Sequence, residues 1–380
     1  MNIVVLRETV SGEARVALVP ESVRKLVALK ATVRVESDAG LGAAITDDDY
    51  RQAGAETSHD RDELLRSADI LAVVNRPPHD VIAQLRKGAV VIGFLRPLDE
   101  PEALEPALNQ GLTTFAVELI PRITRAQAMD ALSSMATVVG YKAVLLGAAQ
   151  IPRMFPLLMT AAGTVPPARV LVLGAGVAGL QAIATARRLG AVVESYDVRA
   201  AAGEQVRSLG ATFLEVDLGG IKTEDAGGYA VELSDEAMDR GRALIAERAR
   251  VADVVITTAQ VPGRRAPLLL TEEAVDGMKR GSMVIDLAGS TGGNCAVSKP
   301  DDIVEREGVT IMAPLNLAAT VPVHASQLYS RNLTAFLSIL IQDGELKIDM
   351  ADDVVGPSCV THQGQVVNQR VASALVPHQA

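Results

Sequence analysis

The chain has 380 residues, more than one hydrophobic core usually serves, so its length predicts two domains. Hydrophobic residues make up 48% of the sequence and charged residues 22%, a balance that excludes global disorder. Aromatic residues contribute only 3%, and the formal net charge is -10. Both features argue against a nucleic-acid partner, because single strands stack on aromatic side chains and phosphates attract basic ones.

The N-terminal segment predicts a first strand rather than a signal peptide, because its short apolar run soon meets Arg7 and Glu8. No window holds the roughly 18 consecutive apolar residues of a membrane span, so we expect none. Cys295 and Cys359 lie far apart and match no disulfide or zinc spacing, as expected in a reducing compartment. We therefore expect the chain to be cytoplasmic.

Short Val- and Ile-rich runs alternate with helix-like stretches, first before residue 120 and again from residue 169. Strands that alternate with helices predict a parallel, doubly wound sheet. We thus predict an α/β fold with two Rossmann-like domains. The expected strands are residues 3–6, 32–36, 70–74, 90–94 and 113–117 in the first sheet, and 170–173, 192–196, 212–216, 253–257, 283–287 and 309–312 in the second.

Two long helices are expected to connect the sheets, over residues 126–150 and 325–341. A Pro-containing linker is expected after the first of them. The tail beyond the second is too short to fold alone and resembles a hairpin around Gln363 and Gly364, so we expect it to return to the first domain. The predicted domains are 1–125 with 342–380, and 165–324, with the cleft between them as the natural site.

A glycine-rich turn follows the first strand of the second domain and opens a helix. Gly174 allows the tight turn, Gly176 lets the backbone approach a pyrophosphate, and Gly179 allows close packing of helix on strand. The helix N-terminus, at Val177 and Ala178, supplies N–H donors and a positive dipole to phosphates. Strand, glycines, helix and second strand fall in the order that a dinucleotide site requires.

Asp197 ends the second strand of this domain, about 20 residues after the glycines. A carboxylate there accepts hydrogen bonds from both adenosine ribose hydroxyls and repels a 2'-phosphate, which favours NAD over NADP. Arg199 could instead recognise a 2'-phosphate, although a solvated arginine is the commoner role of such a residue. We therefore predict NAD(H) as the cofactor.

Polar side chains recur every three residues near the expected start of the first long helix, at Gln127, Asp130 and Ser133. On a helix they would share one side, with Arg122 just before it. Amide, carboxylate, hydroxyl and guanidinium groups orient a carboxamide and ribose hydroxyls, so we predict a nicotinamide-positioning site. Structural roles stay open, because Thr124 and Gln127 fit a capping box and Asp130 would favour the helix dipole.

Other catalytic motifs are missing from the sequence. The five histidines show no metal-ligand spacing, so we predict no metal site. Neither a GxxxxGK[ST] phosphate loop nor a GxSxG nucleophile elbow is present. Hydride chemistry on a bound cofactor remains.

The whole chain resembles the NAD(H)-binding component, domain I, of proton-translocating nicotinamide nucleotide transhydrogenase, a relative of alanine dehydrogenase. The resemblance implies that Arg122, Gln127, Asp130 and Ser133 hold the nicotinamide and its ribose. The segments that carry it are residues 7–8, 15–20, 121–123, 174–179, 197–200, 226–230, 256–259 and 292–295.

The same resemblance implies further cofactor contacts. A mobile loop over residues 222–232 would close on the nucleotide through Gly228 and Tyr229. The adenosine ribose would lie at Asp197 and its neighbour Val198. Thr258, Ala259 and Gln260 would border the cofactor, and Gln260 departs from the apolar residue of the family.

Alanine dehydrogenases supply the main alternative function. They need a lysine and a histidine for the proton transfers of amine oxidation. Here Asn75 and Arg96 occupy those positions, and only Arg15 is retained. Direct hydride transfer between two nicotinamides needs positioning and no protein acid or base, which suits this chain better.

The resemblance also implies partners, because the chain has one dinucleotide fingerprint. We expect a homodimer, a separate NADP(H)-binding subunit and a separate membrane-domain subunit that couples Si-Re-specific hydride transfer to proton translocation. The chain would then be peripheral on the cytoplasmic face of the inner (plasma) membrane. Two alternatives stay open: an NAD(H)-responsive regulatory protein, and an S-adenosylmethionine methyltransferase, which leaves residues 122–133 unexplained.

Overall fold

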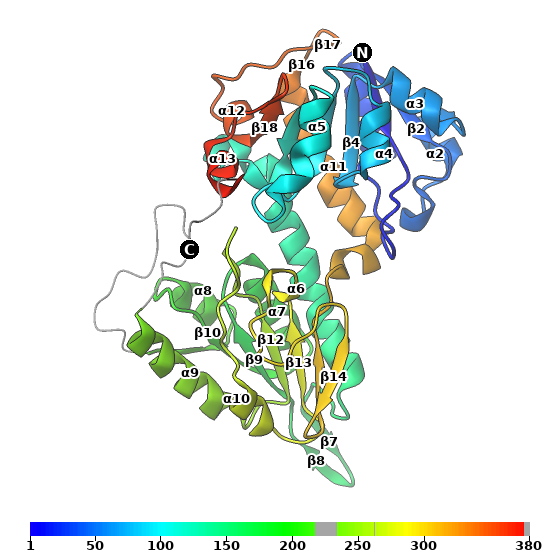
Figure 1. Cartoon of the computed structure of the whole chain (residues 1–380). Helices are drawn as coiled ribbons and strands as arrows, with labels where there is room; N and C mark the ends of the chain where they lie inside the picture. Colours follow the sequence, from blue (N-terminus) through cyan, green and yellow to red (C-terminus); the bar gives the residue numbers. More distant parts are fainter. Residues whose placement is uncertain (217–233, 262, 376–380) are drawn as a thin grey trace. The chain divides into compact units, whose positions relative to one another are not determined.

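The computed structural model describes residues 1–216, 234–261 and 263–375 (Figure 1). The chain divides into two compact units, Met1–Met135 with Ala318–Ala380 (the first unit) and Ala136–Leu317 (the second unit). Each unit contains a mainly parallel sheet with helices packed on it. The predicted α/β class with two Rossmann-like sheets is confirmed.

The first unit has an eight-stranded sheet in the order β3-β2-β1-β4-β5-β6-β18-β19. The six strands from β1 to β6 are parallel and follow the 3-2-1-4-5-6 order of dinucleotide-binding folds. The tail adds the antiparallel β18 and β19 through a turn at Gln363 and Gly364, whose φ angles are 51° and 78°, which confirms the predicted hairpin. The strands are β1 (Asn2–Val5), β2 (Thr32–Glu36), β3 (Glu56–Ser58), β4 (Ile70–Asn75), β5 (Val90–Phe94), β6 (Thr113–Ala116), β18 (Cys359–His362) and β19 (Gln365–Val366).

Helices cover both faces of this sheet, which explains why its central strands are continuous apolar runs rather than alternating ones. One face packs against α3 (Arg61–Ser67), α4 (His79–Gln84), α5 (Glu105–Asn109) and α13 (Gln369–Leu375). On the other, Phe336 of α11 (Pro322–Leu340) meets Phe115 of β6 edge-on, with 5.3 Å between ring centroids. The remaining elements are α1 (Pro20–Ala28), α2 (Asp47–Gln52), α12 (Val355–Ser358), the 3-10 turns η1 (Leu41–Ala43), η2 (Pro101–Leu104), η3 (Val117–Leu119) and η4 (Thr124–Met129), and the small hairpin β16 (Ile341–Gln342) with β17 (Glu345–Leu346).

The second unit has a seven-stranded sheet in the order β11-β10-β9-β12-β13-β15-β14. All neighbours are parallel except β14, which pairs antiparallel with β15 at the edge. The direction of the strand order reverses between β9 and β12, and open α/β sheets bind ligands at the carboxyl ends of such strands. The strands are β9 (Arg169–Leu173), β10 (Val192–Tyr196), β11 (Thr212–Leu214), β12 (Val254–Thr257), β13 (Met283–Asp286), β14 (Ile303–Arg306) and β15 (Val309–Met312).

Helices also cover both faces of the second sheet. The cluster around Val172 and Ile256 packs one face against α6 (Ala131–Gln150), α7 (Val177–Arg188) and α8 (Ala202–Ser208). The cluster around Leu171 and Val255 packs the other against α9 (Asp235–Ala249) and α10 (Glu272–Asp276). Two 3-10 turns follow, η5 (Gly289–Thr291) and η6 (Leu317–Thr320).

Each predicted strand is present, with small differences at its ends. Several short strands were not predicted, among them β3 and β14. The segment expected to be a simple linker forms a hairpin of β7 (Leu158–Thr160) and β8 (Gly163–Val165), so that part of the prediction was incomplete. Met159 of this hairpin is 79% exposed, and a pair this short with no buried face leaves no periodic signal.

The long helix α6 begins at Ala131, not at residue 126 as predicted, and it crosses the boundary between the two units. Within the second unit its Gly140 lies so close to α7 that an added Cβ would be 2.1 Å from the Ala178 carbonyl oxygen. By length and composition α6 is long and apolar enough to cross a membrane, with a mean hydropathy of 1.4, and 39% of that stretch is buried. Core helices meet the same criteria, so this composition is weak support for a span. The second long helix, α11, starts at Pro322 rather than at residue 325, as suits proline in a first turn.

Candidate functional site

The glycine-rich turn of the second unit follows β9, and its three glycines differ in what surrounds them. Gly174 has a φ of 99°, and an added Cβ would lie 2.5 Å from the Thr258 hydroxyl oxygen. At Gly179 an added Cβ would lie 1.8 Å from the Gly174 carbonyl oxygen. No atom lies within 4 Å of a Cβ added at Gly176. Packing therefore requires two of the glycines, whereas the third leaves its backbone open to an approaching group.

Helix α7 begins at this open position. Gly176 is its N-cap and makes no side-chain capping hydrogen bond, and Val177 is 40% exposed. The first N–H groups of a 12-residue helix and its dipole therefore point to the space beside Gly176. Such an end suits the phosphates of a dinucleotide.

Asp197 follows β10, next to the glycine-rich turn. Its Oδ2 accepts hydrogen bonds from the Ala175 N–H at 2.7 Å and from Nη2 of Arg199 at 2.8 Å. Its Oδ1 accepts from the backbone N–H and from Nε of Arg199, both at 2.9 Å. The two side chains are 5% and 22% exposed. Arg199 is thus held in a forked ion pair, and the expectation of a solvated arginine was wrong. Val198, between them, packs partly against the core.

Residues 258–260 follow β12, the strand beside β9. The Thr258 hydroxyl donates to the Gly174 carbonyl at 3.1 Å, so this segment is tied directly to the glycine-rich turn. The Ala259 N–H donates to Oδ1 of Asn294 at 3.0 Å. Gln260 is exposed and donates to the Leu287 carbonyl at 2.9 Å. The structure thus gathers Thr258 and Ala259 with the fingerprint glycines.

A buried pair that was not predicted from the sequence, Asp286 and Asn294, supports this segment. Asp286 is fully buried and accepts from the Thr257 hydroxyl at 2.8 Å and from the Asn294 N–H at 2.8 Å. Asn294 in turn binds Ala259 through both its amide oxygen and its amide nitrogen. An acidic residue at the end of a predicted strand, followed by paired glycines, was the available signal for this support.

Gln127, Asp130 and Ser133 belong to the first unit, and the structure divides them between two elements. Asp130 lies just before α6, and its carboxylate accepts from the Ser133 N–H at 2.8 Å and from the Ser133 hydroxyl at 2.6 Å. It thereby caps the helix, because aspartate is among the best residues at that position. Gln127 lies on η4 and is exposed, as is Arg122.

Two local predictions made for this segment were therefore wrong. The capping box of Thr124 and Gln127 does not form, because η4 is a 3-10 turn with Ile123 as its N-cap and no side-chain capping bond. The three polar residues do not share one side of a single helix, because α6 starts only at Ala131. Asp130 and Ser133 are nevertheless in direct contact, as a pair that would face a ligand together requires.

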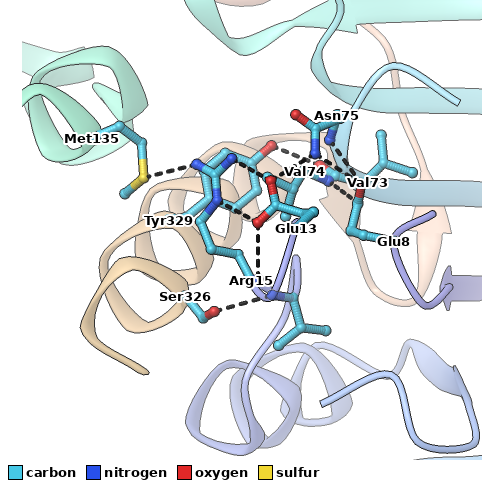
Figure 2. A network of polar contacts seen from close by, with 10 residues as sticks. Glu8, Glu13, Arg15, Val73, Val74, Asn75, Met135, Ser326 and Tyr329 are labelled. Carbon is cyan, nitrogen blue, oxygen red and sulfur yellow. Dashed lines mark hydrogen bonds and ion pairs between the residues drawn. The ribbon is translucent and has the colours of Figure 1, made fainter. Parts of the chain in front are cut away.

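A buried polar network fills the corresponding reversal point of the first sheet, at the ends of β1 and β4 (Figure 2). Glu13 holds Arg15 in a fork, with contacts of 2.8 and 2.6 Å, and the fork keeps the pKa of Glu13 at about 2. Asn75 donates to Glu13 at 2.9 Å and to Glu8 at 3.1 Å. Burial raises the pKa of the Glu8 carboxyl. Arg15 also donates to the sulfur of Met135 at 3.4 Å.

This network bears on amine oxidation. Asn75, at the position where alanine dehydrogenases have lysine, is bonded to two carboxylates. Arg96, at the position of their histidine, forms ion pairs with Asp99 at 3.5 Å and Glu100 at 3.2 Å. Neither side chain is an acid or base near neutral pH. The described part of the chain also holds no group of three His, Cys, Asp or Glu side chains that could bind a metal.

Glu118, at the end of β6, provides a pH-dependent test of the first unit. Burial raises the pKa of its carboxyl to about 7, although the backbone N–H groups of Leu95 and Arg96 donate to it. Its buried Oε2 has no hydrogen-bond partner among the described residues. The folded chain therefore binds this proton more tightly than the unfolded chain, and the resulting stability is lost as pH rises through 7.

The variant Glu118→Gln is expected to match the wild type in stability near pH 5 and to exceed it at pH 8 by up to about 3 kcal/mol, because one pKa unit corresponds to about 1.4 kcal/mol. Urea unfolding at both pH values measures the difference. Glu102→Gln, at an exposed carboxyl of η2, is the matched control and should show no such trend. Equal stability of Glu118→Gln and wild type at pH 8 would contradict the raised pKa.

Gly228 and Tyr229, which the resemblance places in a closing loop, lie outside the described residues.

Comparison with known proteins identifies the family. The model of the alanine dehydrogenase/PNT N-terminal domain matches residues 4–139, and that of the C-terminal domain matches residues 143–369. The chain belongs to the alanine dehydrogenase/PNT family. It is 46% identical to a chain of NAD(P) transhydrogenase subunit alpha from Rhodospirillum rubrum, over 97% of this chain and 98% of that protein.

Solved structures agree with this assignment. The crystal structure of transhydrogenase from Sinorhizobium meliloti matches with a TM-score of 0.88 and 46% identity, over 97% of this chain and 100% of that one. An L-alanine dehydrogenase matches with a TM-score of 0.83 and 27% identity, over 98% and 99%. The suspected resemblance is confirmed, and the higher identity lies on the transhydrogenase side of the family.

Proposed function

We propose that the chain is the NAD(H)-binding subunit of an NAD(P) transhydrogenase and that it transfers hydride directly and reversibly between NADH and NADP+ held by a partner subunit. The observation that carries the proposal is an intact dinucleotide fingerprint in a chain with 46% identity to a transhydrogenase subunit over nearly its whole length. The lack of a lysine or histidine at the positions of Asn75 and Arg96 supports it, because hydride exchange between nicotinamides needs no protein acid or base.

The residues of the second unit fit the adenosine end of NAD(H). The space beside Gly176 and the uncapped start of α7 would receive the pyrophosphate. Asp197, at the end of β10, would accept hydrogen bonds from the ribose hydroxyls. Thr258 and Ala259, fixed by Gly174 and Asn294, would border the cofactor.

The residues of the first unit would orient the reactive end. When bound, the nicotinamide supplies or accepts the hydride. The Asp130–Ser133 pair offers carboxylate and hydroxyl oxygens in a fixed geometry for a carboxamide and its ribose. Gln127 and Arg122 would add an amide and a guanidinium. Positioning of this kind accounts for a large part of the rate of transfer between two bound reactants.

Partners complete the proposed enzyme. We propose a homodimer that docks with a separate NADP(H)-binding subunit, and a separate membrane subunit that couples Si-Re-specific hydride transfer to proton translocation. The chain would act as a peripheral subunit on the cytoplasmic face of the inner (plasma) membrane. The subunit names of its relatives support this assembly.

Reconstitution tests the proposal. The purified chain, mixed with an NADP(H)-binding transhydrogenase component, is expected to reduce an NADP+ analogue with NADH rapidly, as followed by absorbance. Each component alone is the control. A rate no higher than the controls would sink the proposal.

Alanine dehydrogenase activity is the second candidate, favoured by the structural match to L-alanine dehydrogenase and by the retained Arg15. Alanine-dependent reduction of NAD+ by the chain alone would establish it. Tight NADH binding with neither reaction would instead favour an NAD(H)-responsive regulatory protein.

A further inference from the structure

The four hydrogen bonds at Asp197 use the acceptor positions of its carboxylate. An ionised carboxylate has about four lone-pair sites on its two oxygens. Ala175 occupies one, and Arg199 occupies the other three through its backbone N–H, Nε and Nη2. The pair is also sheltered, since the Asp197 side chain is only 5% exposed. No acceptor position of this carboxylate therefore remains for a ribose diol in the structure described.

The two side-chain bonds of Arg199 are the ones that can be exchanged. The Ala175 bond holds the glycine-rich turn and the backbone bond of Arg199 holds the chain after β10, so both are part of the local fold. The guanidinium stands on a flexible stem and is 22% exposed. Two ribose hydroxyls that replace Nε and Nη2 would restore two hydrogen bonds to Asp197.

We propose that the Asp197–Arg199 ion pair determines which adenosine ribose the chain accepts. A 2',3'-diol displaces the Arg199 guanidinium from Asp197, and the carboxylate in turn keeps Arg199 neutralised so that it does not capture a 2'-phosphate. Removal of the carboxylate charge then frees a guanidinium beside the ribose position, where a phosphate is its preferred planar, bidentate partner. The inference rests on the proposed NAD(H) binding and adds Arg199 as a specificity-determining residue.

The test is a set of three variants, with dissociation constants for NADH and NADPH measured by isothermal titration calorimetry. Asp197→Asn keeps an oxygen for the Ala175 N–H and turns a donor toward Arg199. It is expected to lower the preference for NADH over NADPH by about 100-fold, through weaker NADH and stronger NADPH binding. Asp197→Asn combined with Arg199→Gln should lose NADH affinity without gaining NADPH affinity. Arg199→Gln alone should bind NADH at least as tightly as the wild type, because the competing guanidinium is gone.

A second forked pair provides the control. Arg306 binds both oxygens of Asp276 through Nε and Nη2, on the surface at α10 and β14. Asp276→Asn removes the same charge from the same geometry and should change neither affinity. Thermal unfolding checks that all variants are folded.

The outcomes separate this inference from the proposed function. A wild type that binds neither nucleotide overturns both. A wild type that binds NADH overturns only the inference if Asp197→Asn gains no NADPH affinity, or if that gain persists without Arg199. A large loss of NADH affinity in Arg199→Gln also overturns it, because the guanidinium would then be a ligand of the nucleotide rather than its competitor.

Discussion

A Gly176→Ala variant is expected to fold like the wild type and to bind NADH about 100-fold more weakly, because an added methyl group would stand where the backbone must approach the pyrophosphate. No atom lies within 4 Å of that methyl position, so the folded chain has room for it. Gly176 also lies in an extended conformation, with a φ of -77°, that alanine adopts without strain. The whole effect should therefore appear in nucleotide binding.

Gly179→Ala is the matched contrast. Its methyl group would lie 1.8 Å from the Gly174 carbonyl oxygen, a contact that the backbone of the turn must relieve by moving. Overpacking of this kind costs about 1–3 kcal/mol or more, which outweighs the gain of about 1 kcal/mol from placing alanine in a helix. This variant is expected to melt several degrees lower and also to lose NADH affinity.

Circular dichroism melting and NADH titration measure both variants. The decisive comparison is the melting temperature, which should fall in Gly179→Ala and stay unchanged in Gly176→Ala while both lose affinity. Unchanged NADH affinity in Gly176→Ala would mean that the pyrophosphate does not bind at the start of α7.

The fingerprint was predictable because its chemistry is local. Gly174, Gly176, Gly179 and Asp197 lie within one strand–helix–strand unit, and sequence order brings such a unit together in one way. The strands of both sheets were predictable for a related reason: burial on both faces makes them continuous apolar runs. The sequence contains each of these signals within a few residues of the structure they produce.

Features that depend on distant partners were not predictable. Asp286 looks like the last residue of an ordinary strand, and its role as a buried acceptor appears only when residues 294–298 fold back onto it. Arg199 looks like a surface arginine until Asp197 is seen to occupy its fork. In both cases the partner is chosen by tertiary structure among many possible ones.

The start of α6 shows a different limit, the competition between two local signals. Thr124 and Asp130 are both good N-caps, and the sequence offers no way to rank them. The structure uses Asp130, so the preceding residues form a 3-10 turn that ends at Met129. The predicted site residues were nevertheless right in one respect, since the helix start itself brings Asp130 and Ser133 together.

An Asp130→Asn variant is expected to slow hydride transfer in the reconstituted system by about 10- to 100-fold while NADH affinity changes little, because small errors in the position of a reactant cost rates of that size. The new side chain still accepts the Ser133 N–H through its oxygen, so the cap of α6 persists. Its amide nitrogen, however, faces the Ser133 hydroxyl, which must then accept rather than donate. The pair would present a reversed set of donors and acceptors to the carboxamide.

Three further variants divide the role of Asp130 between catalysis and folding. Asp130→Ala removes the cap and should also cost about 1 kcal/mol of stability. Ser133→Ala leaves the backbone cap intact and should slow hydride transfer without loss of stability. Thr124→Ala, at an exposed position of η4, is the control and should change neither quantity. If Asp130→Asn and Ser133→Ala transfer hydride at the wild-type rate while Asp130→Ala melts early, Asp130 serves only to cap α6, and the orienting groups for the nicotinamide must lie elsewhere in the chain.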